Sequence, residues 1–397
     1  MSRVVVTSSI ALGAVVLAFA SCANTEVASP EQEDASSSVG AVDAGGDTDA
    51  APEAAACDVG DPGCVSTVVR SEDAAWCPVA APVDPRCTLT AVWGTGKDDV
   101  LAVGSGGTIL RWDGKTWTLL PAPENVKNTF FAIWGSGPDD VWLGSGTSVL
   151  FHASARTQGR PDFKLVENLT GDPFNSAAIY AIWGSGRGDV RIGGGIYAFD
   201  TPEGWGWGNQ FVRGAPDDPW AKVEGAAIVS SIWGTAANDV WVAADNSAVE
   251  PWQKGMILHG TGADPTSLVW TAVDSQAAVP LTAIWGSSAD DVWAVGESGT
   301  IRHLGAGAVR WEIVPSPTTA HLRRLWGTGP KDIWAVGDRG TILHYDGTAW
   351  KPSLAALPLG EKPKLYGVWG SSAGDVWIVG DGIVLRSTGK TVVGGGS

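Results

Sequence analysis

The dipeptide Trp-Gly returns seven times in this chain at a spacing that few folds can accommodate. The distances between successive tryptophans are 41, 49, 50, 52, 41 and 43 residues, and an Asp follows each tryptophan by six residues. The tryptophans of this repeat are Trp93, Trp134, Trp183, Trp233, Trp285, Trp326 and Trp369. Repeats of about 40 to 50 residues are typical of β-propeller blades, which are four-stranded sheets arranged around a central axis.

Each repeat divides into four short segments with strand composition. In the sixth copy, "LRRLWGTGPKDIWAVGDRGTILHYDGTAWKPS" at 322–353, the apolar runs are separated by Gly, Asp and Pro, and Asp346-Gly347 favours a tight hairpin turn. The runs are apolar on both alternating sets of side chains, as strands require when both faces of a sheet are covered. We therefore predict an all-β fold, a seven-bladed β-propeller of four-stranded antiparallel blades.

The two ends of the repeat region predict how the ring closes. The last repeat, at 365–388, supplies three strands and then ends, whereas Trp76 stands 17 residues before Trp93, at the spacing of a fourth strand. We therefore predict that 74–80 complete the last blade, so that an N-terminal strand closes the ring. Closure would remove the unpaired sheet edges that promote aggregation.

Two of the repeats resemble a known class of propeller. The phrases "DIWAVGDRGTILHYDGTAW" and "LAVGSGGTILRWDGKTW" are similar to the Asp-box-type repeats of bacterial neuraminidase-like propellers, and especially of the photosystem assembly-factor propellers. Similar tryptophan-rich repeats recur in predicted lipoproteins of myxobacteria. The resemblance covers 74–390 and implies a blade rather than a reaction. Because Asp and Gly are adjacent in Asp113-Gly114 and Asp346-Gly347, unlike in the Asp-box, neither sialidase activity nor photosynthetic function is carried over.

The N-terminus has the composition of an export signal. Arg3 is followed by a mostly apolar run that ends at Ala20, and then by Ser21 and Cys22. This order resembles a bacterial lipoprotein signal, which implies that 1–22 are a signal peptide, that Cys22 carries a lipid and that the protein is anchored at the outer membrane. Phe19 departs from the Leu that is usual in such signals, and an ordinary cleaved signal is the alternative.

The next segment, 23–73, contains twelve acids and one base, which accounts for most of the net charge of −17. Since it contains little apolar surface to bury, we expect a disordered acidic tether before a propeller domain at 74–397. Cys57, Cys64, Cys77 and Cys87 predict two disulfides in an exported protein. Pairing Cys57 with Cys64 and Cys77 with Cys87 closes the shortest loops and is preferred, although the sequence does not fix the connectivity.

The charge and the motifs limit the possible partners. An acidic protein of this kind repels nucleic acid and anionic lipid head groups, so we expect membrane contact only through the lipid anchor. We also expect a monomer. We expect no cofactor and no metal, because the spacing of the cysteines does not suit zinc and no metalloprotease, serine-hydrolase or phosphate-loop motif is present. Doubled acids such as Asp290-Asp291 would allow weak calcium binding only.

The repeated Asp and His residues are interpreted as architectural. Seven Asp spread around a ring cannot form one catalytic pair, so each is expected to close the turn after its first strand. His259, His303 and His344 share one position of the third strand, where other repeats have arginine, and are interpreted as solvent contacts at the strand end. His152 and His321 fall outside this pattern.

Most of the 22 tryptophans are explained by the repeat, and the remainder supply candidate contact residues. Trp205, Trp207 and Phe211 belong to an insertion that we place between the third and fourth strands of the third unit. Trp252 belongs to an insertion between the second and third strands of the fourth unit. Aromatic residues on such loops bind ligands or fold back and bury themselves. Because alternating connections emerge on opposite faces of a propeller, these two insertions are not expected to form one site.

These observations favour a non-enzymatic binding or scaffolding propeller at the cell envelope, which recognises protein or glycan partners with its variable loops. The alternative is a propeller-based glycan hydrolase or lyase at the cell surface. Such an enzyme would need a convergent set of carboxylate, Tyr or Arg side chains at one mouth of the channel. A purely structural envelope component is a third possibility.

Overall fold

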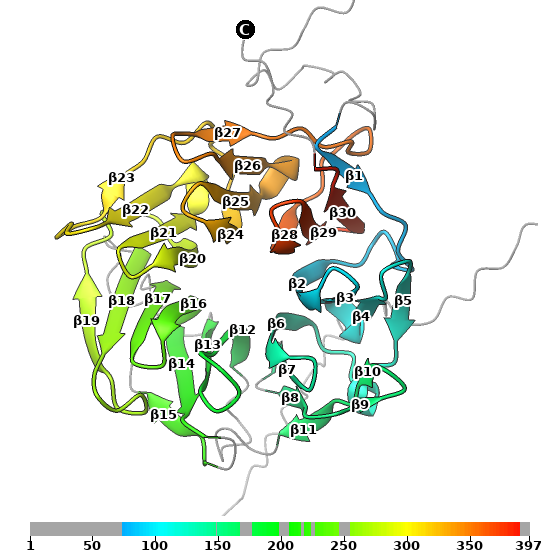
Figure 1. Cartoon of the computed structure of the whole chain (residues 1–397), viewed down its shortest axis with the longest axis horizontal. Helices are drawn as coiled ribbons and strands as arrows, with labels where there is room; N and C mark the ends of the chain where they lie inside the picture. The colour runs from blue at the N-terminus through cyan, green and yellow to red at the C-terminus, as the bar shows by residue number, and fades with distance from the viewer. Residues whose placement is uncertain are drawn as a thin grey trace, which may run out of the picture.

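The computed structural model describes residues 74–147, 149–166, 177–197, 206–215, 218–223, 227–245 and 255–389. Seven four-stranded antiparallel sheets are arranged as a ring around a central axis, which confirms the predicted propeller (Figure 1). The predicted signal peptide and tether, 1–73, lie outside the described residues. No helix in the described ranges is long and apolar enough to span a membrane.

Each blade places its strands in chain order from the axis outward, except the last, whose outermost strand comes from the N-terminus. The innermost strands are β2 (Leu89–Gly96), β6 (Phe130–Gly137), β12 (Ala178–Trp183), β16 (Ile228–Ala236), β20 (Leu281–Ser288), β24 (Leu322–Gly329) and β28 (Leu365–Ser372). The second strands are β3 (Asp99–Gly104), β7 (Asp140–Ser145), β13 (Val190–Tyr197), β17 (Asp239–Asp245), β21 (Asp291–Gly296), β25 (Asp332–Gly337) and β29 (Asp375–Gly380). The third strands are β4 (Ile109–Trp112), β8 (Leu150–Ala153), β14 (Gly206–Arg213), β18 (Gly255–Thr261), β22 (Ile301–Gly305), β26 (Ile342–Tyr345) and β30 (Ile383–Ser387). The outermost strands are β5 (Trp117–Leu120), β11 (Lys164–Val166), β15 (Ala221–Val223), β19 (Val269–Val273), β23 (Glu312–Ile313), β27 (Trp350–Pro352) and β1 (Trp76–Pro78).

The Trp-Gly dipeptide recurs because each tryptophan packs over the glycine of the next blade. A Cβ atom on Gly135 would lie 2.7 Å from the indole of Trp93 and 2.4 Å from the carbonyl oxygen of Asp140, so only glycine leaves room for the ring. The same contact joins every other neighbouring pair of blades: Trp134 with Gly184, Trp183 with Gly234, Trp233 with Gly286, Trp285 with Gly327, Trp326 with Gly370 and Trp369 with Gly94. These seven contacts, which we call the Trp-Gly ring, are unbroken around the axis.

Tryptophans of the second and outer strands pack in the cores between blades. Second-strand tryptophans such as Trp142 and Trp377 are fully buried, and outer-strand tryptophans meet them edge to face. Trp112, which takes the position of Tyr345 in the sixth unit, is also buried, with its ring centroid 5.0 Å from that of Trp377 and 5.8 Å from that of Trp117. Its place in the fold is therefore structural.

Strand β1 completes the last blade, as predicted. Trp76 lies opposite Ser387 of β30, and the sheet order is β1-β30-β29-β28. The Trp76 indole is fully buried, packs edge to face on Trp334 at 4.9 Å and donates a hydrogen bond to Ser353 Oγ at 3.0 Å. Figure 1 shows the blue N-terminal strand beside the red C-terminal strand.

In six of the seven blades the repeated Asp ties the first three strands together, which agrees with an architectural role. In the second blade Ser136 Oγ donates to Asp140 Oδ2 at 2.6 Å, and His152 Nε2 lies 2.7 Å from Asp140 Oδ1. The His152 ring also stacks on Trp142, with centroids 3.8 Å apart. The equivalent pairs are His259 with Asp239, His303 with Asp291, His344 with Asp332, Arg111 with Asp99 and Arg386 with Asp375.

This geometry corrects two interpretations of the histidines. The third-strand position is a hydrogen-bonded stacking position rather than a solvent contact. His152 also belongs to this set. It follows its Asp by twelve residues, as His303 and His344 do, and this spacing was a signal in the sequence.

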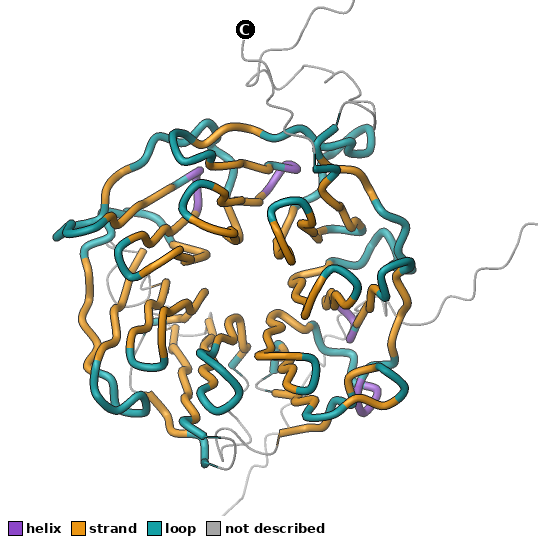
Figure 2. Tube along the Cα trace, viewed as in Figure 1, coloured by secondary structure: helices purple, strands orange, loops and turns teal. Residues whose placement is uncertain are grey.

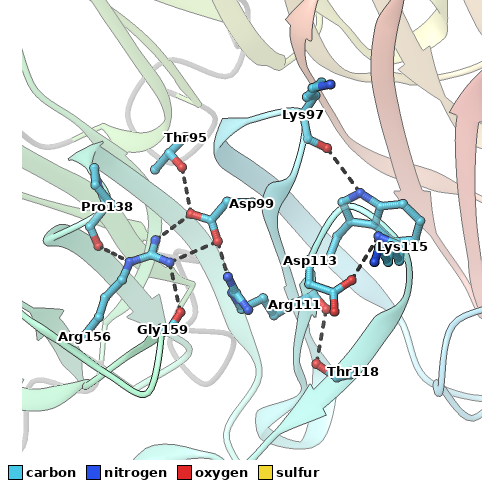
Figure 3. A network of polar contacts seen from close by, with 11 residues as sticks. Thr95, Lys97, Asp99, Arg111, Asp113, Lys115, Thr118, Pro138, Arg156 and Gly159 are labelled. Atoms are coloured by element: carbon cyan, nitrogen blue, oxygen red, sulfur yellow. Dashed lines mark hydrogen bonds and ion pairs between the residues drawn. The ribbon is translucent and has the colours of Figure 1, made fainter.

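The first blade has a stronger version of this contact, drawn in Figure 3. Asp99 accepts hydrogen bonds from the hydroxyl of Thr95 and from Arg111 Nε, at 2.7 Å and 3.0 Å. Arg156, from the hairpin β9 (Arg156–Thr157) and β10 (Arg160–Pro161), adds contacts of 3.0 Å and 2.6 Å to the same carboxylate. Because the hairpin leaves the second blade, this ion pair joins the first two blades.

Candidate binding site at the mouth of the channel

Every innermost strand carries a β-bulge three residues before its repeat tryptophan. In β2, for example, Leu89 lies opposite Gly104 and Ala91 lies opposite Val103, so Thr90 is the extra residue. The extra residues of the seven strands are Thr90, Phe131, Tyr180, Ser230, Thr282, Arg323 and Tyr366, which we call the bulge ring. A bulge changes the direction of one side chain without disturbing the rest of the ladder.

All seven residues of the bulge ring line one cavity of about 530 Å³, the mouth cavity. Its other lining residues lie at the beginning of the innermost strands or at the end of a second strand: Thr88, Ser105, Thr129, Ile228, Asp245 and Arg324. A smaller cavity of about 120 Å³, lined by the residues one and two positions before the repeat tryptophans, shares several lining residues with it. Figure 2 shows the innermost strands converging on the axis. All seven blades therefore contribute side chains to a common space at the mouth cavity.

The bulge ring contains two kinds of side chain, small ones with a hydroxyl group and large ones. The hydroxyls of Ser230 and Thr282 donate to carbonyl oxygens of the next blade at 2.7 Å and 2.6 Å, and Thr90 does the same. Phe131 packs edge to face on Tyr180, with centroids 5.3 Å apart. Across the ring, the Arg323 guanidinium lies 4.8 Å from the centre of the Tyr366 ring. The cavity thus has two aromatic walls, separated by short polar side chains.

The cavity contains two guanidinium groups in different environments. Arg323 forms an ion pair with Asp338, with Nη2 3.0 Å from Oδ2. Arg324, the next residue, lies half-buried and reaches across the axis to the carbonyl oxygen of Tyr180, 3.4 Å from its Nη2. Burial and the neighbouring Arg323 charge lower the pKa of Arg324 to about 10, so the side chain remains a cation at neutral pH.

The two tyrosines keep their hydroxyl protons at neutral pH. Burial raises the pKa of Tyr180, and burial together with the Asp381 charge raises that of Tyr366. Asp245 is the only carboxylate among the described lining residues, so these residues do not include the two acids that most glycoside hydrolases use. No cluster of three or more potential metal ligands occurs in the described part of the chain.

Of the aromatic residues singled out in the sequence, the structure describes only the side chain of Phe211. Trp205 and Trp252 lie outside the described residues, and Trp207 is described only by its backbone, which pairs with Ile196. Phe211 is 5% exposed and packs in the core between the second and third blades. Its side chain therefore offers little surface to a ligand.

The structure also corrects the placement of the third-blade insertion. Strands β13 and β14 are the second and third strands of their sheet, so the insertion between Tyr197 and Gly206 is a second-to-third connection. The insertion between Asp245 and Gly255 is a connection of the same kind in the next blade. Both therefore leave the same face of the propeller, and Asp245 lines the mouth cavity on that face.

The predicted cysteine pairing stays a prediction, because Cys57 and Cys64 lie outside the described residues. Cys77 lies on β1 opposite Arg386, and Cys87 is 1% exposed. Near these residues a cavity of about 680 Å³ separates the N-terminal segment from the loop before β28, with Pro78, Pro85 and Pro363 in its lining. This cavity is lined by residues from 78–85 and from 358–384.

The bulge ring was missed in the sequence, although the repeats contain a signal for it. When the seven copies are aligned on their tryptophans, the position four residues before Trp is always apolar, whereas the next position varies in chemistry between Thr, Phe, Tyr, Ser and Arg. Variation at one position of an otherwise regular repeat indicates a place that packing does not determine. What the sequence could not show is that a bulge directs these seven side chains to one face.

The comparisons with known proteins bear on the fold. The sequence matches no protein-family model and no curated protein. A solved structure of "YCF48 bound to D1 peptide" superposes with a TM-score of 0.59 at 16% identity, covering 79% of this chain and 96% of that one. YCF48 from Cyanidioschyzon merolae gives 0.57 at 16% identity over 79% of this chain and 99% of that one, and the WD40 propeller domain of Doa1 gives 0.53 at 12% over 76% and 92%. At these identities the likeness establishes that the chain has a β-propeller fold.

Proposed function

We propose that this protein is a binding module that holds a protein partner at the mouth cavity. The observation that carries the proposal is the bulge ring, because each blade directs its most variable inner-strand side chain into one space of about 530 Å³. A cavity of this size with aromatic walls and a few polar groups is typical of a recognition site. Tyrosine and arginine, which both occur here, are also the residues most often found at the energetic centres of protein interfaces.

The structural neighbours support a protein partner over other ligands. The YCF48 propeller, which shares this fold, is described in complex with a D1 peptide. Propellers of the WD40 type share the fold as well. Neither neighbour identifies the partner of this chain, whose mouth cavity has its own set of side chains.

We also propose that the propeller acts at the cell envelope as a lipoprotein attached through Cys22. The apolar run that ends before Ser21-Cys22 and the acidic composition of 23–73 support export followed by a tether. A flexible chain of about 50 residues spans roughly 40 Å, which would allow the propeller to reach partners beyond the membrane surface. Metabolic labelling with a fatty acid would test the lipid, since replacing Cys22 by Ser should abolish the label.

Site-specific photo-crosslinking tests the binding site. A photoreactive phenylalanine in place of Phe131 should join the chain to a partner protein in cells that produce it. The matched control has the same group in place of Val309, which is 95% exposed on a third-to-fourth connection and therefore on the opposite face. Equal crosslinking from both positions would contradict a partner at the mouth. A crosslinked product that contains carbohydrate and no second polypeptide would show that the partner is a glycan and not a protein.

A further inference from the structure

Arg324 is an inner-strand residue of the described propeller that blade packing does not require. The position two residues before the repeat tryptophan holds a small side chain in the six other blades: Ala91, Ala132, Ala181, Ser231, Ala283 and Gly367. Since six blades pack around the axis without a long side chain, the sixth does not need one for the fold. A cation that is half-buried beside the channel is unfavourable unless it gains a partner.

The described surroundings of Arg324 leave its charge without a counter-ion. Its guanidinium contacts three carbonyl oxygens, those of Thr282, Arg323 and Tyr180, at 3.2 Å, 3.4 Å and 3.4 Å. These distances are long for hydrogen bonds from a guanidinium group, and Arg324 forms no ion pair with any described residue. Asp338 is paired with Arg323, and Asp245, the carboxylate that lines the same cavity, forms no ion pair with Arg324.

The walls of the mouth cavity suit a ligand with an apolar part next to an acid. Phe131 and Tyr180 form one wall and Tyr366 stands on the other side of the axis. Their rings offer faces and edges for stacking. A guanidinium group can hold a carboxylate through two parallel hydrogen bonds, which a backbone carbonyl cannot replace.

We propose that Arg324 binds a carboxylate of the partner, while the aromatic walls contact the apolar side chain beside it. The proposal rests on the proposed function, because it takes the partner to be a protein. It identifies the recognised element as a short peptide segment in which an acidic group adjoins an aromatic or large aliphatic residue. Arg324 is then the residue that determines specificity, and the bulge ring supplies contact area.

Two small probes test the carboxylate directly. N-acetyl-L-phenylalanine has a carboxylate, a peptide group and an aromatic ring, whereas N-acetyl-L-phenylalaninamide differs only in lacking the charge. Titration of the full chain, followed by ligand-observed NMR, should show that the acid binds about tenfold more tightly than the amide. The variant Arg324→Ala should bind both probes alike, with the affinity that the native chain has for the amide.

Two further variants control for charge and folding. Arg310→Gln removes an exposed cation on the opposite face and should leave the preference for the acid unchanged. Arg324→Lys retains a charge without the two-pronged geometry and should retain only part of the preference. Arg324→Ala gives the residue that four other blades already have, and a melting curve like that of the native chain would show that it folds. Equal affinity of the native chain for acid and amide would overturn the proposal, as would a preference that survives Arg324→Ala.

A third probe separates a peptide from an acidic sugar as the source of the carboxylate. Glucuronate that binds through Arg324 under conditions in which N-acetyl-L-phenylalanine does not bind would overturn the peptide assignment. Crosslinking in the variants distinguishes failure of the carboxylate proposal from failure of the binding site. If the partner is lost in Tyr180→Ala and Tyr366→Ala but is still crosslinked in Arg324→Ala, the binding function is retained and the proposal that Arg324 binds a carboxylate is overturned. A partner that all three variants keep overturns the binding site itself.

Discussion

Two positions on the same seven strands have opposite constraints. The glycine after each repeat tryptophan is invariant because the tryptophan of the neighbouring blade occupies the space where its side chain would be. Four residues earlier, the bulge ring holds five different residue types and faces a cavity. The difference shows that this propeller separates its packing from its recognition within a single strand. Substitutions at the two positions should therefore have opposite consequences for stability and for binding.

The largest loss of stability is expected for a substitution in the buried contacts of strand β1, where the ring closes. Trp76→Ala would leave a large void beside Trp334 and is expected to lower the free energy of unfolding by about 3–5 kcal/mol. Urea unfolding followed by tryptophan fluorescence measures this loss. Trp270→Ala, at the equivalent outer strand of the fourth blade, is the comparison. The Trp270 side chain is only half-buried, so this variant should lose clearly less free energy of unfolding. Equal losses would contradict a special role for closure.

The Trp-Gly ring allows a sharper test with two glycines of one strand. Gly135→Ala places a methyl group against Trp93 and should lower the free energy of unfolding by about 1–3 kcal/mol. Gly137→Ala, two residues further along β6, meets no atom within 4 Å and should change it by less than about 0.5 kcal/mol. If both variants unfolded at the same urea concentration, the tryptophan contact would not explain the invariant glycine.

The Asp that ties the first three strands predicts a pH dependence. Burial raises the pKa of Asp140, but hydrogen bonds from His152 and Ser136 outweigh it and lower the pKa below its ordinary value. A carboxyl group with a lowered pKa in the folded state contributes stability above its unfolded pKa of about 4, and this contribution is lost as the pH falls through the folded value. Asp140→Asn should therefore cost about 1–3 kcal/mol at pH 7 and less below pH 4.

Unfolding free energies at pH 7 and pH 3 measure this effect. Asp98→Asn is the control, since the Asp98 side chain is mostly exposed and, of the described residues, only Lys97 lies within ion-pair distance of it, at 3.8 Å. The control should follow the pH dependence of the native chain. A loss in Asp140→Asn that is the same at both pH values would contradict a contribution from the ionised carboxylate.

The smallest effect on stability is expected in the recognition part. Arg324→Ala should change the free energy of unfolding by less than about 1 kcal/mol, and in the direction of greater stability, because it removes a half-buried cation without a counter-ion. The same unfolding assay measures it. A loss as large as that of Gly135→Ala would show that the channel needs the arginine for packing. It would contradict a separation of packing and recognition positions within the inner strands.

The fold could be predicted because its determinants recur. Seven tryptophans at near-constant spacing, turn residues between short apolar runs and a spare strand at Trp76 indicate blades, their number and their closure. The site could not be predicted in the same way. The sequence places Phe211 in a loop, but the tertiary structure buries it between blades, and the connection before β14 joins different strands from those expected. Assignment of strands by apolar runs alone fails where an insertion interrupts a blade.

The sequence by itself determined the all-β architecture, because a repeat that packs on its own copies must contain the same contacts in every copy. Only the tertiary structure decided where recognition takes place. A β-bulge has no composition of its own, so the turning of Thr90, Tyr180 or Arg323 toward the axis appears only when strand registers are known. Residues up to about 280 positions apart in the chain meet at the mouth cavity because the ring closes. Their common space is a property of the closed ring and not of any single repeat.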